Sequence, residues 1–162
     1  MRVASYIQDS IVDGKGLRFT LFAQGCIHRC EGCHNPQTHD PEGGTEMSVD
    51  EIVEIIMKNP LTDGVTFSGG EPFLQPQDCA KIAREVKAEG LNVWAYTGFI
   101  FEDLLSDEKP AVREFLALCD VLIDGPFILA DRSLGARWIG SKNQRVIDVK
   151  KSLATGRTIL YD

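Results

Sequence analysis

The chain has 162 residues, enough for one domain with a buried core but fewer than the roughly 250 of a complete eight-stranded βα barrel. Hydrophobic residues make up 43% and charged residues 25%, and no apolar run approaches the roughly 20 residues needed to span a bilayer. The net charge of −7 disfavours a nucleic-acid partner, because such binding depends on Lys and Arg neutralising phosphates. With no basic and apolar leader at the N-terminus, we expect a cytoplasmic protein in which residues 1–162 form one domain and no membrane is bound.

In chain order, the hydrophobic pattern predicts strands that alternate with helices. The first strand is expected at 19–24, and the next helix opens at Ser48, which forms a capping box with Glu51, and stops at Pro60. The remaining predicted elements are a strand at 65–68, a helix at 76–89, a strand at 92–96, helices at 101–105 and 111–119, and strands at 121–123 and 145–149.

This alternation predicts an α/β fold with mainly parallel strands. Because the chain is too short for a closed barrel, we expect an incomplete, TIM-like βα barrel with one open side. In such sheets the site lies at the carboxyl ends of the strands.

An unusual local sequence follows each of four predicted strands. A loop rich in Gly, His and Cys follows the first strand, and Ser68-Gly69-Gly70-Glu71-Pro72 follows the second. Tyr96-Thr97-Gly98 follows the third strand, and Asp124-Gly125-Pro126 follows the fourth. Because the carboxyl ends of parallel strands meet at one edge, these four segments predict a single shared site.

Three of the five cysteines, Cys26, Cys30 and Cys33, form the pattern Cys-x-x-x-Cys-x-x-Cys. A four-iron cluster usually takes four thiolates, so three would leave one iron with an open position. The alternative is three free thiols, or a zinc site completed by His28, His34 or His39, although structural zinc sites often use two separated ligand pairs. Cys79 and Cys119 occur at helical spacing with apolar residues, which predicts buried, non-ligating thiols.

The Gly69-Gly70-Glu71-Pro72 segment permits two interpretations. Gly and Pro mark turns in any protein. Alternatively, two glycines let the backbone approach a ligand closely, and the Glu71 carboxylate can accept hydrogen bonds from a cationic amine.

The cysteine pattern, followed one βα unit later by Gly69-Gly70-Glu71-Pro72, resembles the radical S-adenosylmethionine superfamily. The resemblance implies that Cys26, Cys30 and Cys33 hold one 4Fe-4S cluster. It implies that S-adenosylmethionine binds the fourth iron through its amino and carboxylate groups, with Gly69, Gly70, Glu71 and Pro72 around the amino group. It also implies reductive cleavage of S-adenosylmethionine to a 5′-deoxyadenosyl radical, with no catalytic side chain beyond the cluster ligands.

Two further pairs of motifs narrow the resemblance. Residues 11–18 (IVDGKGLR) and 33–36 (CHNP) are similar to the activating enzymes of glycyl-radical proteins. Residues 124–127 (DGPF) and 141–148 (SKNQRVID) are similar to the branch that activates anaerobic ribonucleoside-triphosphate reductase. This branch implies that reductase as the protein substrate and a flavodoxin- or ferredoxin-type electron donor.

Tyr96-Thr97-Gly98 permits two interpretations, a pocket wall with Thr97 near the ligand or a strand that ends in a Gly turn. Asp124 ends a buried strand, where an unpaired carboxylate is costly, and the resemblance implies that this strand end lies near the cofactor. His34 or Asn35 is expected near the adenine, because Gly32 stands where many members have an aromatic residue. Two other functions remain open. One is the activation of a different glycyl-radical enzyme, such as pyruvate formate-lyase, or action on a small molecule. The other, from a different class, is a non-catalytic zinc-stabilised adaptor.

Overall fold

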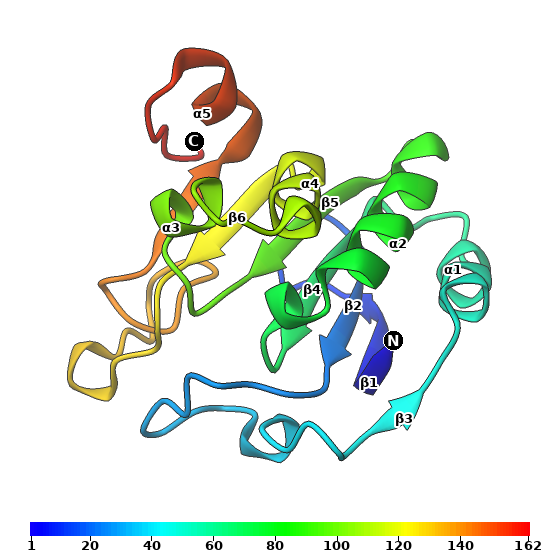
Figure 1. Cartoon of the computed structure of the whole chain (residues 1–162), viewed down its shortest axis with the longest axis horizontal. Coiled ribbons are helices and arrows are strands. Elements are labelled where there is room, and N and C mark those ends of the chain that lie inside the picture. The colour runs from blue at the N-terminus through cyan, green and yellow to red at the C-terminus, as the bar shows by residue number, and fades with distance from the viewer.

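The computed structural model describes every residue from Met1 to Asp162 and contains one seven-stranded sheet in the order β3-β1-β2-β4-β5-β6-β7 (Figure 1). The strands are β1 (Arg2–Ser10), β2 (Arg18–Ala23), β3 (Thr45–Glu46), β4 (Gly64–Gly69), β5 (Asn92–Tyr96), β6 (Val121–Asp124) and β7 (Arg145–Asp148). The α-helices are α1 (Val49–Met57), α2 (Pro76–Ala88), α3 (Phe101–Leu105), α4 (Pro110–Leu118) and α5 (Val149–Thr155). Three short 3-10 helices are η1 (Pro36–Thr38), η2 (Pro72–Leu74) and η3 (Leu129–Asp131).

The four central strands, β2, β4, β5 and β6, are parallel. Each crossover between them contains at least one helix, as parallel neighbours require. The outer pairings β1–β2, β1–β3 and β6–β7 are antiparallel. The predicted α/β class and its parallel strands are therefore confirmed.

The capping box predicted at the start of α1 is present. The Ser48 side chain accepts a hydrogen bond of 3.1 Å from the Glu51 backbone N–H, so one otherwise unpaired amide of the first turn is satisfied. The predicted strand at 145–149 is also present, but it ends at Asp148 and runs antiparallel to β6.

Among the strands and α-helices, three were not predicted, namely β1, β3 and α5. Most side chains of β1 are exposed, so its sequence does not show the alternation of apolar and polar residues that identifies a half-buried strand. At the other end of the chain, the Asp148 carboxylate accepts from the Lys151 N–H and starts α5, where strand was expected to continue to Val149.

One face of the sheet is covered by helices. Alternate strand residues such as Phe19, Leu21 and Phe67 enter a large apolar cluster together with side chains of α1, α2 and α4. Cys79 and Cys119 lie in this cluster with no exposed surface, which confirms the prediction that they are buried apolar residues. This layer contains most of the buried apolar surface and fixes the strand positions.

The opposite face is more polar and more aromatic. Arg18 is fully buried there, donates to Thr66 Oγ1 over 2.6 Å and lies over the Trp94 ring at 5.2 Å. Burial lowers the pKa of its guanidinium to about 10, so Arg18 remains charged at neutral pH. Trp94 packs edge-on against Trp138, which brings the loop after β6 across this face of the sheet.

The loops that follow β2, β4, β5 and β6 leave the sheet at its carboxyl edge. In Figure 1 the long loop after β2 passes along this edge before the chain reaches β3. No helix combines the length and the apolar composition needed to cross a bilayer.

Candidate functional site

A cavity of about 500 Å³ lies at the carboxyl ends of the central strands. All four of the predicted strand-end segments contribute to its wall, so they meet around one cavity. The lining residues singled out by the sequence are Cys26, Cys30, Cys33, His34, Asn35, Gly69, Gly70 and Thr97.

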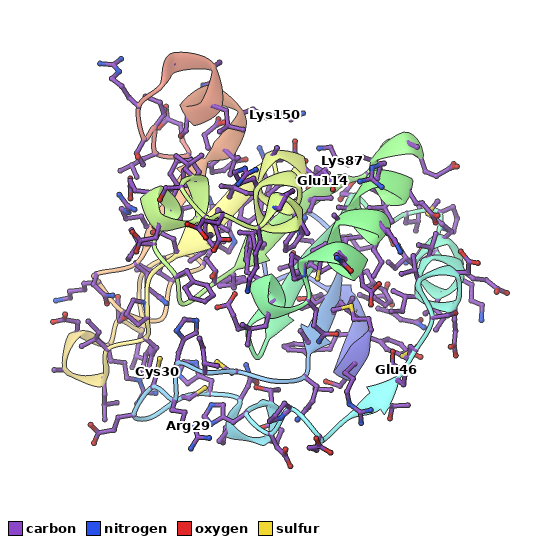
Figure 2. All side chains as sticks on the ribbon, in the orientation of Figure 1. Arg29, Cys30, Glu46, Lys87, Glu114 and Lys150 are labelled. Atoms are coloured by element: carbon purple, nitrogen blue, oxygen red, sulfur yellow. The ribbon has the colours of Figure 1, made fainter.

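The three cysteines face this cavity from the loop after β2. Each side chain is half-buried, and none forms a disulfide. The base of the loop is held by the Gly25 N–H, which donates to the Thr38 carbonyl over 2.6 Å, and by the Gln24 side chain, which donates to the Asp40 carbonyl. Figure 2 shows Cys30 near the tip of this loop, beside the segment that follows β6.

The environment of Cys26 affects its thiolate in two opposing ways. Burial raises the pKa of the Cys26 thiol, while the backbone N–H groups of His28 and Arg29 hydrogen-bond to its sulfur and oppose that rise. A positive φ of 49° at Arg29 gives the backbone the local bend that this arrangement requires. No three His, Cys, Asp or Glu side chains converge as ligands of a single metal ion.

Gly69 and Gly70 line the same cavity as the cysteines. The Gly70 N–H donates to the Ala23 carbonyl over 2.8 Å, while the Gly70 carbonyl accepts no hydrogen bond from protein. A Cβ atom at Gly70 would lie 2.4 Å from the Gly25 carbonyl oxygen. Only glycine therefore allows the end of β4 to pack this closely against the base of the cysteine loop.

Glu71 and Pro72 do not line the cavity. Glu71 has no exposed surface, and its Oε1 accepts from the Phe73 N–H and the Thr97 hydroxyl. Its Oε2 accepts from the Gly98 N–H over 2.8 Å and contacts His28 Nε2 at 2.7 Å. Pro72 is buried at the start of η2. Each carboxylate oxygen thus has two internal partners, so within this segment the groups that face the cavity belong to Gly69 and Gly70.

Of the two predicted pocket residues that follow β5 and end β6, Thr97 lines the cavity and Asp124 does not. The Thr97 hydroxyl is used by Glu71. Asp124 is buried at the end of β6, where its carboxylate accepts from the Phe101 N–H and from Arg145 at 2.5 and 3.1 Å. The neighbouring Gly125, rather than Asp124, lines the cavity.

His34 and Asn35 line the far end of the cysteine loop. The His34 ring packs against Phe127 with 5.0 Å between ring centroids, and both residues border the cavity. Gly32 lies against Leu129, since a Cβ atom there would be 2.9 Å from Leu129 Cδ1. An aromatic ring is therefore supplied to this part of the cavity by Phe127, from the loop after β6, rather than by residue 32.

Several residues of the site were missed in the sequence. His28 was considered only as a possible zinc ligand, and its contact with Glu71 depends on two loops meeting in space. Trp138, which lines the cavity with a positive φ of 67°, lies in a loop that has no periodic pattern. The motif containing Asp13 was recognised, but nothing in it indicated that Asp13 would reach the cavity wall.

The residues present fit a cluster with a bound small molecule. A volume of about 500 Å³ falls within the range of about 300–1,000 Å³ that is usual for small-molecule sites. Three thiols and a wall of glycine backbone share this space, as a cluster and a closely approaching ligand would require. His39 Nε2, from a residue that also lines the cavity, is buried without a hydrogen-bond partner in the protein.

Comparison with known proteins identifies the type of cluster. A family model described as a 4Fe-4S single cluster domain matches residues 12–147, which include the whole cysteine loop and all four strand-end segments. Cluster chemistry is thereby favoured over a single zinc ion. Fold and site define the class as an α/β iron–sulfur protein with one 4Fe-4S cluster.

Curated relatives extend the similarity to nearly the full chain. The chain is 34% identical to the anaerobic ribonucleoside-triphosphate reductase-activating protein of Escherichia coli K12, over 90% of this chain and 97% of the relative. It is 32% identical to the protein of the same name from Haemophilus influenzae, over 89% and 96%. It is 33% identical to the protein of the same name from Enterobacteria phage T4, over 83% of this chain and 86% of the relative. The chain belongs to the family of anaerobic ribonucleoside-triphosphate reductase-activating proteins.

Proposed function

We propose that this protein generates the glycyl radical of an anaerobic ribonucleoside-triphosphate reductase by reductive cleavage of S-adenosylmethionine. The observation that carries the proposal is the shared cavity that three cysteines line together with Gly69 and Gly70. The names of the relatives support the reductase as partner. When bound, the cluster supplies one electron to the sulfonium, which gives methionine and a 5′-deoxyadenosyl radical that removes one hydrogen atom from a glycine Cα.

The residues of this chain bind and orient the two cofactors. Cys26, Cys30 and Cys33 hold three irons as thiolates, which leaves the fourth iron available to the methionine end of S-adenosylmethionine. The unpaired Gly70 carbonyl is suited to accept from the methionine ammonium group. Glu71, whose oxygens already accept internal hydrogen bonds, contributes by holding the surrounding loops.

The adenine end of S-adenosylmethionine is assigned to the far side of the same cavity. Its ring would lie near His34 and Phe127, and the Asn35 side-chain amide, which makes no hydrogen bond within the protein, is suited to bind a polar edge of the base. Thr97 lines the same cavity, and Asp124 supports the wall through its contacts with Arg145 and Phe101.

The proposal includes an incomplete barrel as the finer description of the fold. Its support is an open strand order in which the edge strands β3 and β7 do not pair with each other. An open side gives a glycine-bearing segment of the partner a route to the strand ends. We further propose that residues 1–162 act as one domain in the cytoplasm, with a flavodoxin- or ferredoxin-type electron donor and with no membrane or nucleic-acid partner.

An anaerobic reaction tests this function. The reduced protein is mixed with S-adenosylmethionine and the reductase, and the glycyl radical is measured by electron paramagnetic resonance. We expect a radical on the reductase and one 5′-deoxyadenosine for each radical formed. A radical on pyruvate formate-lyase but none on the reductase would overturn the partner, and one zinc with no iron in the purified protein would overturn the chemistry.

A further inference from the structure

The segment between the first and third cysteines has one hydrogen bond to residues outside the loop that follows β2. The Cys33 N–H donates to the Cys30 carbonyl, the amides of His28 and Arg29 face the Cys26 sulfur, and the Asn35 N–H donates to Cys33 Sγ. These bonds remain inside the loop. His28 Nε2, at 2.7 Å from Glu71 Oε2, makes the single hydrogen bond from residues 27–33 to another part of the fold.

Three contacts fix the orientation of the His28 ring. Because a carboxylate oxygen accepts only, Nε2 carries the proton in the bond to Glu71. The ring also packs edge-on against Phe99 with 4.6 Å between centroids. It lies directly over Gly98, where a Cβ atom would be 2.4 Å from His28 Cδ2. The side chain of His28 is only 15% exposed, so these contacts define one position rather than a mobile surface residue.

Glu71 connects this ring to the two neighbouring strand ends. Its other acceptor sites are taken by the Phe73 N–H after β4 and by the Thr97 hydroxyl and Gly98 N–H after β5. The carboxylate is fully buried, so its geometry is set by these donors and not by solvent. A shift of His28 relative to Glu71 would therefore move the cysteines relative to both strand ends.

We propose that His28 is a positioning residue that acts through Glu71. It holds the Cys26–Cys30 turn at a fixed distance from the Gly69-Gly70 wall. The inference rests on the proposed function, because the spacing it sets is the one between the open iron and the backbone that binds the methionine end of S-adenosylmethionine. The structure assigns Glu71 the same positioning role in place of direct contact with the methionine amine.

The test uses the cluster-loaded protein and three variants. His28→Phe keeps a ring against Phe99 but removes the donor, and His28→Gln restores a donor without the ring. Glu31→Gln, an exposed position on the same loop, is the matched control. Iron is counted first, and S-adenosylmethionine is then titrated while the spectrum of the reduced cluster is followed by electron paramagnetic resonance.

We expect wild-type iron content in all three variants. For His28→Phe we expect about a tenfold weaker binding of S-adenosylmethionine, equivalent to about 1.4 kcal/mol, with an altered spectrum of the bound form. His28→Gln should recover part of the affinity, and Glu31→Gln should match wild type. Wild-type affinity and spectrum for His28→Phe would overturn the proposal, as would loss of the cluster from both His28 variants.

A second measurement does not require the cofactors. Hydrogen–deuterium exchange over residues 27–33 should be faster in His28→Phe than in wild type or Glu31→Gln, because the variant loses the single hydrogen bond that ties this segment to the strand ends. Unchanged exchange would contradict the inference. If wild-type protein binds no cluster or does not respond to S-adenosylmethionine, the proposed function fails, whereas exchange still reports on His28 separately.

Discussion

The cysteines divide between two regions that treat the same side chain differently. Cys79 and Cys119 lie in the apolar layer between sheet and helices, fully buried, and burial raises the pKa of both thiols. Cys26, Cys30 and Cys33 lie half-buried around the cavity at the strand ends. The first region keeps thiols protonated and inert, whereas the second leaves them accessible to metal.

The two regions are also held together by different forces. The layer between sheet and helices is stabilised by apolar side chains that interlock, so single changes there act mainly on stability. The strand-end region depends on a few polar contacts and on close backbone approaches at Gly70 and Gly98. Changes there should act on cluster and ligand binding as well as on folding.

The largest expected contrast is between Cys30→Ala and Cys79→Ala. Cys30→Ala should lose the 4Fe-4S cluster and reduce 5′-deoxyadenosine formation to background, because only two thiols remain. Cys79→Ala should keep both, with the free energy of unfolding lowered by about 1 kcal/mol. Iron analysis and chromatography of the reaction products measure the two effects. Cluster loss from Cys79→Ala with retention in Cys30→Ala would reverse the assignment of the two regions.

The close approach at Gly70 should give the next largest effect. An added Cβ would lie 2.4 Å from the Gly25 carbonyl oxygen, which belongs to the backbone and cannot rotate away. We expect Gly70→Ala to lower the free energy of unfolding by about 2–3 kcal/mol and to impair cluster binding. Gly135, which has no atom within 4 Å of an added Cβ, provides the control. Equal urea midpoints and iron contents for Gly70→Ala and Gly135→Ala would refute this account of the wall.

A third comparison separates support of the cavity wall from contact with the ligand. Arg145 bonds the buried Asp124 carboxylate, so Arg145→Met should lower the free energy of unfolding by about 1–3 kcal/mol. If Asp124 only supports the wall, Asp124→Asn and Arg145→Met should be non-additive in stability and similar in their effect on S-adenosylmethionine binding. A loss of affinity specific to Asp124→Asn would instead indicate direct contact with the cofactor.

The smallest expected effect comes from Gly98. Gly98→Ala should weaken S-adenosylmethionine binding by about three- to tenfold, because the new methyl group displaces the His28 ring. In a His28→Ala background the ring is absent, so the same change should have less than about a twofold effect. Calorimetric titration of the four proteins measures this coupling. Equal effects in both backgrounds would show that Gly98 and His28 act independently.

The helix layer and the shared strand-end site could be predicted because both follow from local patterns. Apolar spacing located α1, α2 and α4, and the Gly, Cys and Pro segments after β2, β4 and β6 identified the edge that carries the site. The strand β1 escaped prediction because its exposed side chains lack alternation, and α5 because its cap, Asp148, ends a strand.

The individual contacts of the site were harder to foresee. Glu71 was expected to accept hydrogen bonds from a ligand amine, yet its acceptors are used by donors from the cysteine loop and from the loop after β5. His28 and Trp138 also gain their positions from loops that are distant in sequence. Such pairings depend on tertiary packing, which the spacing of residues within one loop does not encode.

The central claim is that the strand-end cavity holds a three-cysteine cluster with one iron open to S-adenosylmethionine. Its most direct test is the electron paramagnetic resonance spectrum of the reduced, anaerobically purified protein before and after S-adenosylmethionine is added. The account predicts a cluster signal whose g-values change when S-adenosylmethionine is added and stay the same when buffer alone is added. A cluster signal that is indifferent to S-adenosylmethionine would contradict it.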